Sequence, residues 1–246
     1  MLEVKGLSKN FGGLAAVSDL SFTIHRGEIF GVIGPNGAGK TTLLNLITGY
    51  LPPSKGSVLF EGRELRGLPP YEICHRGIAR TFQVVRPFAE MSVADNVMTG
   101  ALFAPTHRIT MAQARERADT ALDLVGLIDK RTMLAGGLTI GEKKKLELAR
   151  ALATKPKLLF LDEVMAGLAG GEVDALMDVV ERVADSGTTI LMIEHLVGVI
   201  LALTDRVLVL DFGRELFQGV PEEVVAHPEV IDSYLGKPLD QSQMVR

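Results

Sequence analysis

The sequence has few of the features that mark secreted, membrane-spanning or nucleic-acid-binding chains. Its 246 residues include a single cysteine, Cys74, so no disulfide can form within the chain and a reducing compartment fits. No stretch approaches the ~20 consecutive apolar residues that a membrane span needs, and the N-terminal MLEVKGLSKN has no apolar segment typical of a signal peptide. The net charge of −4 gives no indication of the basic surface that nucleic-acid-binding proteins need. If the protein works at a membrane, other chains must supply the spans.

Apolar residues make up 47% of the chain, which is enough for a hydrophobic core. The opening segment alternates apolar and polar residues, which predicts a small antiparallel sheet before a buried strand over 29–33. Residues 84–155 have helical spacing, and LVGVILAL (196–203) is typical of a core helix. Strands interleaved with helices predict an α/β fold with a mostly parallel, doubly wound sheet. Further strands are predicted from the segments IARTFQ, KLLFLDE, TTILMIEH and DRVLVLDFGRELFQG.

The segment GPNGAGKTT follows the first buried strand and has the spacing G-x-x-x-x-G-K-T. This pattern predicts a loop whose backbone N–H groups surround a phosphate chain, because glycines let the backbone come close. Lys40 would reach the β- and γ-phosphates, Thr41 would reach Mg²⁺, and the following helix would direct its N-terminal dipole at the phosphates. The predicted nucleotide-binding residues here are Gly34, Asn36, Gly37, Ala38, Gly39, Lys40, Thr41 and Thr42.

A second motif, LLFLDE, ends a predicted buried strand with two carboxylates, Asp162 and Glu163. In a parallel sheet this pair would lie beside the phosphate loop, at the carboxyl ends of the strands. Asp162 suits Mg²⁺ coordination, partly through water, and Glu163 would polarise an attacking water. An acidic turn after a strand is common, so the pair alone is weak evidence for a site. It indicates a nucleotide site because it follows the phosphate loop with Lys40 in the same chain.

With these two motifs in this order, the chain resembles the ATP-binding subunits of ABC transporters from about Leu2 to Gly236. The resemblance implies that Phe11 stacks on adenine. It also implies that the Gln83 amide contacts Mg²⁺ or water, and that its backbone transmits changes at that site to the helical segment. It also implies that His195 bridges the γ-phosphate, water and Glu163. The remaining histidines have no such context and are given no role: His25, His75, His107 and His227.

The family's signature motif corresponds to LTIGEKKKLELAR, which begins at Leu138. Across a head-to-tail dimer the resemblance implies that Thr139, Gly141 and Glu142 contact the ATP held by the partner. Ile140 and Glu142 depart from the usual glycine and glutamine. Glu142 favours a helix N-terminus but would repel a γ-phosphate, so its orientation matters. The three lysines after it, residues 143–145, are interpreted as a solvated helix face.

A further departure lies after the acidic pair, where Ala169 stands in place of the usual Asp or Asn and Val164 in place of Pro. The missing polar side chain puts one contact across the dimer interface in doubt. Together with Ile140 and Glu142, it leaves open a subunit that binds ATP but hydrolyses it poorly.

The resemblance implies one ABC ATP-binding domain over 1–246, a P-loop ATPase with a mostly parallel sheet. Residues 1–83 and 156–220 would form the core with an N-terminal antiparallel β subdomain, 84–155 an inserted α-helical signature subdomain, and 221–246 C-terminal helices and tail. ATP and Mg²⁺ are the implied cofactors. The implied partners are a second ATP-binding subunit, two transmembrane permeases and, indirectly, a periplasmic binding protein, but no nucleic acid. The chain would lie peripherally on the cytoplasmic face of the inner membrane.

The sequences of several segments, including AGGLTIGE and the closing PEVIDSYLG, most resemble those of the family branch that takes up branched-chain amino acids. Systems for urea or short amides, or for lipopolysaccharide export, remain alternatives. So does an ABC ATPase without permeases in translation or DNA repair, although the chain has neither a second cassette nor a heptad insert.

Overall fold

The computed structural model describes residues 1–103 and 109–236. His107 and the polar tail 237–246 lie outside the described residues. The chain forms two compact units, Met1–Ile73 with Thr189–Arg246, and Cys74–Thr188. Among the described helices, none combines the length and the apolar character needed to cross a bilayer.

The first unit contains the antiparallel sheet predicted at the N-terminus, with its strands in the order β2-β1-β4-β5. Residues Val17, Leu20, Phe22 and Ile24 of β2 are buried, whereas most of the residues between them face outward. From Leu20 to Ile24 the burial has a period of two, which is the alternation seen in the sequence and places one face of the sheet on the core. The strands are β1 (Leu2–Phe11), β2 (Leu14–Ile24), β4 (Lys55–Phe60) and β5 (Arg63–Glu64).

The other strands of the first unit follow the order β10-β9-β3-β8. Strand β3 (Ile29–Ile33) pairs in parallel with both β8 (Thr189–Ile193) and β9 (Arg206–Asp211), while β10 (Arg214–Gly219) returns antiparallel to β9. Every residue of β3 and β8 is buried, as expected for strands covered on both faces. The helices that begin in this unit are α1 (Lys40–Ile47), α2 (Pro70–His75), α7 (Val197–Leu203), α8 (Pro221–Ala226), α9 (Pro228–Val230) and a π-helix (Ile231–Leu235).

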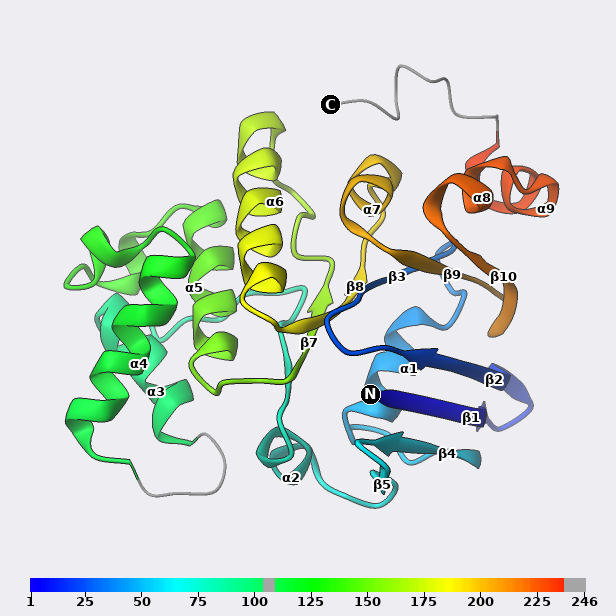
Figure 1. Ribbon diagram of the computed structural model, residues 1–246, viewed down its shortest axis with the longest axis horizontal. Helices are drawn as coiled ribbons and strands as arrows, with labels where there is room; N and C mark the ends of the chain where they lie inside the picture. Colours follow the sequence, from blue (N-terminus) through cyan, green and yellow to red (C-terminus); the bar gives the residue numbers. More distant parts are fainter. Residues whose placement is uncertain (104–108, 237–246) are drawn as a thin grey trace. The chain divides into compact units, whose positions relative to one another are not determined.

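The second unit contains the predicted helical block together with two parallel strands, β6 (Ile78–Arg80) and β7 (Leu158–Asp162). Helices α3 (Val93–Leu102), α4 (Met111–Leu124) and α5 (Ile140–Leu152) pack against one another, as Figure 1 shows. Short 3₁₀ turns cover Ile128–Lys130 and Ala135–Gly137, and α6 (Gly170–Asp185) follows β7.

One strand prediction is too long, because β6 ends at Arg80 and does not extend to Gln83. The Thr81 N–H still bonds to the Phe160 carbonyl oxygen, at 2.9 Å. The next N–H, that of Phe82, instead donates to the Glu147 side chain, at 2.6 Å. A carboxylate therefore takes the place of a neighbouring strand and ends the ladder.

The single thiol gives a first testable prediction. Burial raises the pKa of Cys74, which lies in α2 and is partly covered. Because the thiolate is the nucleophile, a raised pKa leaves less of it at neutral pH. Alkylation of the native protein at pH 7 should be about tenfold slower than that of glutathione, and unfolding in urea should abolish the difference. Equal rates in the native state would contradict the burial of this thiol.

Candidate nucleotide site

The predicted phosphate loop leaves β3 and enters α1 with glycines where only glycines fit. Gly34, Gly37 and Gly39 have φ angles of 148°, 84° and 99°. A Cβ on Gly34 or on Gly39 would also come within 3.0 Å of a backbone oxygen, from Leu210 and Ala16 respectively. Other side chains here would strain the backbone or push neighbouring strands away. The loop is therefore built for close approach by backbone, as the sequence predicts.

Lys40 opens α1 and is buried, with its ammonium group turned back into the loop. Its Nζ donates to the carbonyl oxygens of Gly34 at 2.5 Å and of Pro35 at 2.9 Å. Thr41 is exposed in the first turn of α1, which carries no acidic side chain. The loop thus holds a cation beside a helix N-terminus, which is an arrangement suited to a phosphate group.

His195 and the first residues of the loop line one cavity of about 430 Å³. His195 follows β8 and is exposed, and Asn36 is exposed at the crest of the loop. Both predicted site residues therefore come together in the first unit. The C-terminal π-helix also lines this cavity, through Ser233 and Tyr234, and the sequence motifs gave neither residue a role in the site.

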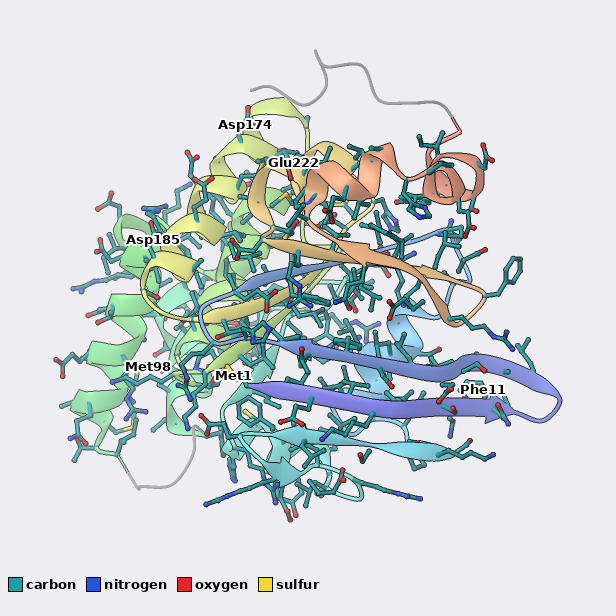
Figure 2. All side chains as sticks on the ribbon, turned by 45° about the vertical axis from the view of Figure 1, so that its right-hand side comes forward. Met1, Phe11, Met98, Asp174, Asp185 and Glu222 are labelled. Carbon is teal, nitrogen blue, oxygen red and sulfur yellow. The ribbon has the colours of Figure 1, made fainter. Side chains whose placement is uncertain are left out.

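Phe11 ends β1 at the turn into β2, as Figure 2 shows, and 47% of its surface is exposed. The Lys9 ammonium lies 5.2 Å from the centre of its ring. An exposed ring is compatible with stacking on a base, which stays a prediction. Phe11 is not among the residues that line the cavity beside His195.

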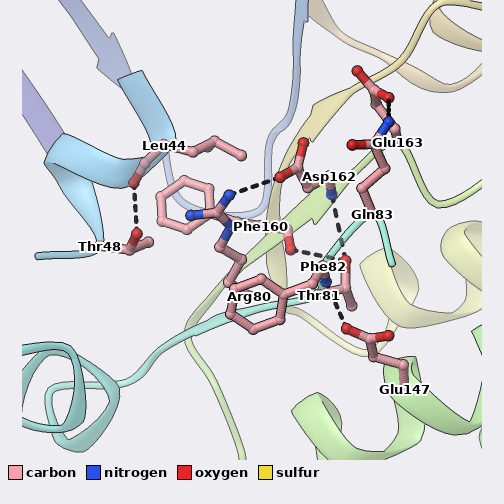
Figure 3. Close-up of polar contacts among 10 residues, drawn as sticks. All are labelled: Leu44, Thr48, Arg80, Thr81, Phe82, Gln83, Glu147, Phe160, Asp162 and Glu163. Atoms are coloured by element: carbon pink, nitrogen blue, oxygen red, sulfur yellow. Dashed lines mark hydrogen bonds and ion pairs between the residues drawn. The ribbon is translucent and has the colours of Figure 1, made fainter. Parts of the chain in front are cut away.

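The second unit brings the acidic pair together with Gln83 (Figure 3). Asp162 ends β7 and forms an ion pair of 2.7 Å with Arg80, and both side chains are only 7% exposed. The Gln83 amide donates to the Glu163 carboxylate. Glu163 is buried and has a φ of 51°, in the left-handed region that a non-glycine residue rarely adopts. Such backbone strain is common where a side chain must be held in one direction for function.

The signature segment begins α5 with a capping box. The Thr139 hydroxyl accepts from the Glu142 N–H at 3.3 Å, and the Glu142 carboxylate accepts from the Thr139 N–H at 3.0 Å. Glu142 also pairs with Lys130. The hydrogen bond from Lys130 is the main reason that the pKa of Glu142 is lowered, so this carboxylate is charged at neutral pH. The Glu142 carboxylate is thus directed at Lys130 and at the Thr139 N–H of its own chain, which answers the question of its orientation left open by the sequence.

The two departures from the family pattern near the helix N-termini have different surroundings. Ile140 is 66% exposed, so most of its bulk faces outward. A Cβ on Gly141 would lie 2.9 Å from a Glu172 carboxylate oxygen, so a larger residue there would displace the end of that side chain. The same carboxylate accepts from the Ala169 N–H at 3.3 Å. Glu172 therefore caps α6 where the side chain of Ala169 cannot.

The capping box yields a second prediction. Thr139→Ala removes the side-chain acceptor at the N-terminus of α5 and should lower the free energy of unfolding by ~1 kcal/mol. Thr139→Ser keeps the acceptor and should match the wild type within a few tenths of a kcal/mol. Urea denaturation of the two variants measures both values. An alanine variant as stable as the wild type would show that the box contributes nothing.

One interpretation of the signature helix is wrong, since Lys144 does not belong to a solvated face. It is buried, and its Nζ lies 3.4 Å from the Glu163 carbonyl oxygen. Lys144 stands four residues before the buried Leu148, so both lie on the same inward side of α5. The sequence also gave no role to Arg80. The signal available was a charged residue in an otherwise apolar strand, three positions before Gln83.

Comparison with known proteins assigns this arrangement to a family. The model of the ABC transporter family matches residues 17–166, and the chain belongs to that family of ATP-binding cassettes. A further model, of the branched-chain amino acid ATP-binding cassette transporter, matches residues 214–240.

The relatives agree with this assignment. The chain is 39% identical to the high-affinity branched-chain amino acid transport ATP-binding protein LivG of Salmonella typhimurium, over 96% of this chain and 98% of LivG. It is 36% identical to BraF of Pseudomonas aeruginosa, a protein of the same description, with the same coverage. A crystal structure of a nucleotide-free ATP-binding cassette from an ABC transporter superposes with a TM-score of 0.87 at 31% identity, covering 96% of this chain and 99% of that one. The predicted family and fold are therefore confirmed.

Proposed function

We propose that the chain is the ATP-hydrolysing subunit of an ABC importer that takes up branched-chain or related amino acids. The observation that carries the proposal is the glycine loop of the first unit, with Lys40 inside it and His195 on the same cavity. Similarity to LivG and BraF over nearly the whole chain supports the class of cargo.

In this proposal the loop holds the phosphates of ATP. The carbonyl oxygens of Gly34 and Pro35 that now accept from Lys40 would yield its ammonium group to phosphate oxygens, which carry more charge. Backbone N–H groups would complete the cradle, and Phe11 would stack on the adenine. Thr41, Gln83 and Asp162 offer the hard oxygen atoms that suit Mg²⁺, partly through water. Mg²⁺ would neutralise the charge that develops on the phosphates.

The hydrolytic step is assigned to Glu163 and His195. The Glu163 carboxylate would accept the proton of a water that attacks the γ-phosphorus, while the bond from that phosphorus to the bridging oxygen breaks. His195 would hold the γ-phosphate and the water in line. Gln83, which already donates to Glu163, would keep that carboxylate directed at the water.

A second cassette, identical or related, is expected to close on the same ATP. Thr139 and Gly141 of each cassette would reach the nucleotide of the other, because they lie at the N-terminus of α5. Glu142 is paired with Lys130, so its charge would be offset near the γ-phosphate. Hydrolysis would remove the contact that joins the two cassettes and let them separate.

The permeases are expected to bind next to Gln83 on the second unit. Large apolar side chains are exposed there: Phe82, Val84 and Phe88. Exposed apolar side chains that gather on one short segment favour a protein partner. The proposal places the chain on the cytoplasmic face of the inner membrane, held by those permeases, with a periplasmic binding protein delivering the cargo to them.

Affinity capture of the tagged chain from gently solubilised native membranes tests this assembly. Recovery of one or two multi-span permeases and a second ATP-binding chain is the expected result, and the identity of the binding protein encoded with them would indicate the cargo. Recovery of soluble partners alone, with the chain absent from membranes, would refute the importer and favour an ABC ATPase without permeases.

A further inference from the structure

The signature helix α5 holds the segment 82–88, here called the glutamine loop, at both of its ends. At one end, the Glu147 carboxylate accepts from the Phe82 N–H at 2.6 Å. At the other end, the Arg150 guanidinium donates to the Arg86 carbonyl oxygen at 3.3 Å and lies 5.0 Å from the centre of the Phe88 ring. Glu147 and Arg150 are three residues apart, so both project from the same side of the helix.

We propose that Glu147 is a positioning residue that couples the glutamine loop to the signature helix. It thereby fixes the direction in which the Gln83 side chain points toward the Glu163 carboxylate. The inference rests on the proposed function and assigns a new residue within it. It concerns how a movement of the loop reaches the catalytic carboxylate, which the P-loop, the acidic pair and the signature motif do not explain.

The first argument is the order of contacts along the chain, shown in Figure 3. Phe82 is held by Glu147, and the next residue, Gln83, donates to Glu163. Adjacent residues cannot move independently, because one peptide plane joins them. Release of the Phe82 N–H would therefore change the direction of the Gln83 side chain. Small displacements of such a group are costly to a reaction that depends on alignment.

The second argument is that Glu147 is a poor choice for stability alone. Its second carboxylate oxygen, Oε2, is buried and finds no hydrogen-bond partner among the described residues. Burial raises the pKa of Glu147, although the Phe82 N–H, Arg150 and Lys144 act in the opposite direction. A buried carboxylate with one oxygen lacking a hydrogen-bond partner in the described part of the chain is costly, and burial opposes its charged form. A glutamate at this position is explained if a strong hydrogen bond from the Phe82 N–H is what matters.

The third argument is the exposure of the loop on its other side. Phe82 and Phe88 are exposed, and they are the two ends that α5 holds. A permease that presses on these rings would act directly on Glu147 and Arg150. Coupling of this kind travels through packed side chains and hydrogen bonds between rigid elements, and α5 is a helix of 13 residues.

Three variants in the complete transporter, reconstituted with its permeases and binding protein, test the inference. Glu147→Ala removes the acceptor, Glu147→Gln keeps an uncharged one, and Glu116→Gln is the matched control on the exposed side of α4. The readouts are uptake of labelled leucine, the kcat and KM of ATP hydrolysis, the stability of the isolated chain in urea, and hydrogen exchange of the peptide that spans 82–88.

For Glu147→Ala we expect uptake and stimulated kcat to fall about tenfold with KM for ATP within about twofold, and for Glu147→Gln about threefold. Hydrogen exchange of the glutamine loop should accelerate in the order wild type, Gln, Ala. Glu147→Gln should be at least as stable as the wild type at pH 7, so lost activity cannot be lost folding. Glu116→Gln should match the wild type in every readout.

Two results would overturn the inference while leaving the proposed function intact. One is a Glu147→Ala transporter with wild-type uptake and kcat. The other is a Glu147→Gln chain whose activity falls only in proportion to its stability, since that indicates a structural role alone. A wild-type complex without ATP-dependent uptake would instead refute the proposed function, and this inference with it.

Discussion

The Glu163→Gln variant should bind ATP as tightly as the wild type and hydrolyse it at least ~100-fold more slowly, because a general base contributes about 10²–10⁴ to such a reaction. Glutamine has the shape of glutamate and can keep a hydrogen bond with Gln83 at the same position. It cannot accept the proton of the attacking water. Binding of a fluorescent ATP analogue and release of phosphate measure the two effects separately.

The matched control for this variant is Glu215→Gln, an exposed change on β10 in the other unit. It should leave both binding and turnover at the wild-type level. A Glu163→Gln chain that hydrolyses ATP near the wild-type rate would remove Glu163 from the role of base. A loss of binding in this variant would show that the carboxylate acts in holding the nucleotide instead.

Lys40→Met should weaken ATP binding by about 100-fold or more, since a lysine bonded to phosphate contributes roughly 1.5–3 kcal/mol per charged contact and more than one contact is expected. Methionine fills much of the buried volume, so the loop should keep its backbone path. The carbonyl oxygens of Gly34 and Pro35 would lose their donor, which costs stability but does not restore affinity.

Lys55→Met is the matched control, because Lys55 is exposed on β4 and lies outside the loop. Isothermal titration with ATP and Mg²⁺ compares the variants, and circular dichroism confirms that each one is folded. Wild-type affinity in a folded Lys40→Met chain would mean that the loop does not hold the phosphates.

Local patterns predicted the parts of the structure that depend on neighbours in sequence. The buried strand over 29–33 has the predicted bounds, because a short apolar run between turn residues has few alternatives. The glycines of the loop were equally predictable, since their positive φ angles strongly disfavour other residue types. Helices α3, α4 and α5 of the second unit lie within 84–155, whose spacing predicted helices, whereas α6 was not predicted.

Contacts between distant residues were not predictable in the same way. Arg80 meets Asp162 across 82 positions of sequence, and Phe82 meets Glu147 across 65. The run of three lysines indicated a solvated face, although Leu148, four residues after Lys144, was a local sign that this side of α5 faces inward. Charge alone suggests solvent, whereas burial depends on which face of a helix the rest of the chain covers.

The most direct test of the account is uptake of labelled leucine by cells that lack the chain and are complemented with the wild type or with Glu163→Gln. The account predicts that deletion lowers uptake severalfold, that the wild type restores it and Glu163→Gln does not, and that unlabelled isoleucine and valine compete while urea does not. Unchanged leucine uptake on deletion, with a defect in urea uptake or in lipopolysaccharide at the cell surface, would contradict it and assign the ATPase to another ABC system.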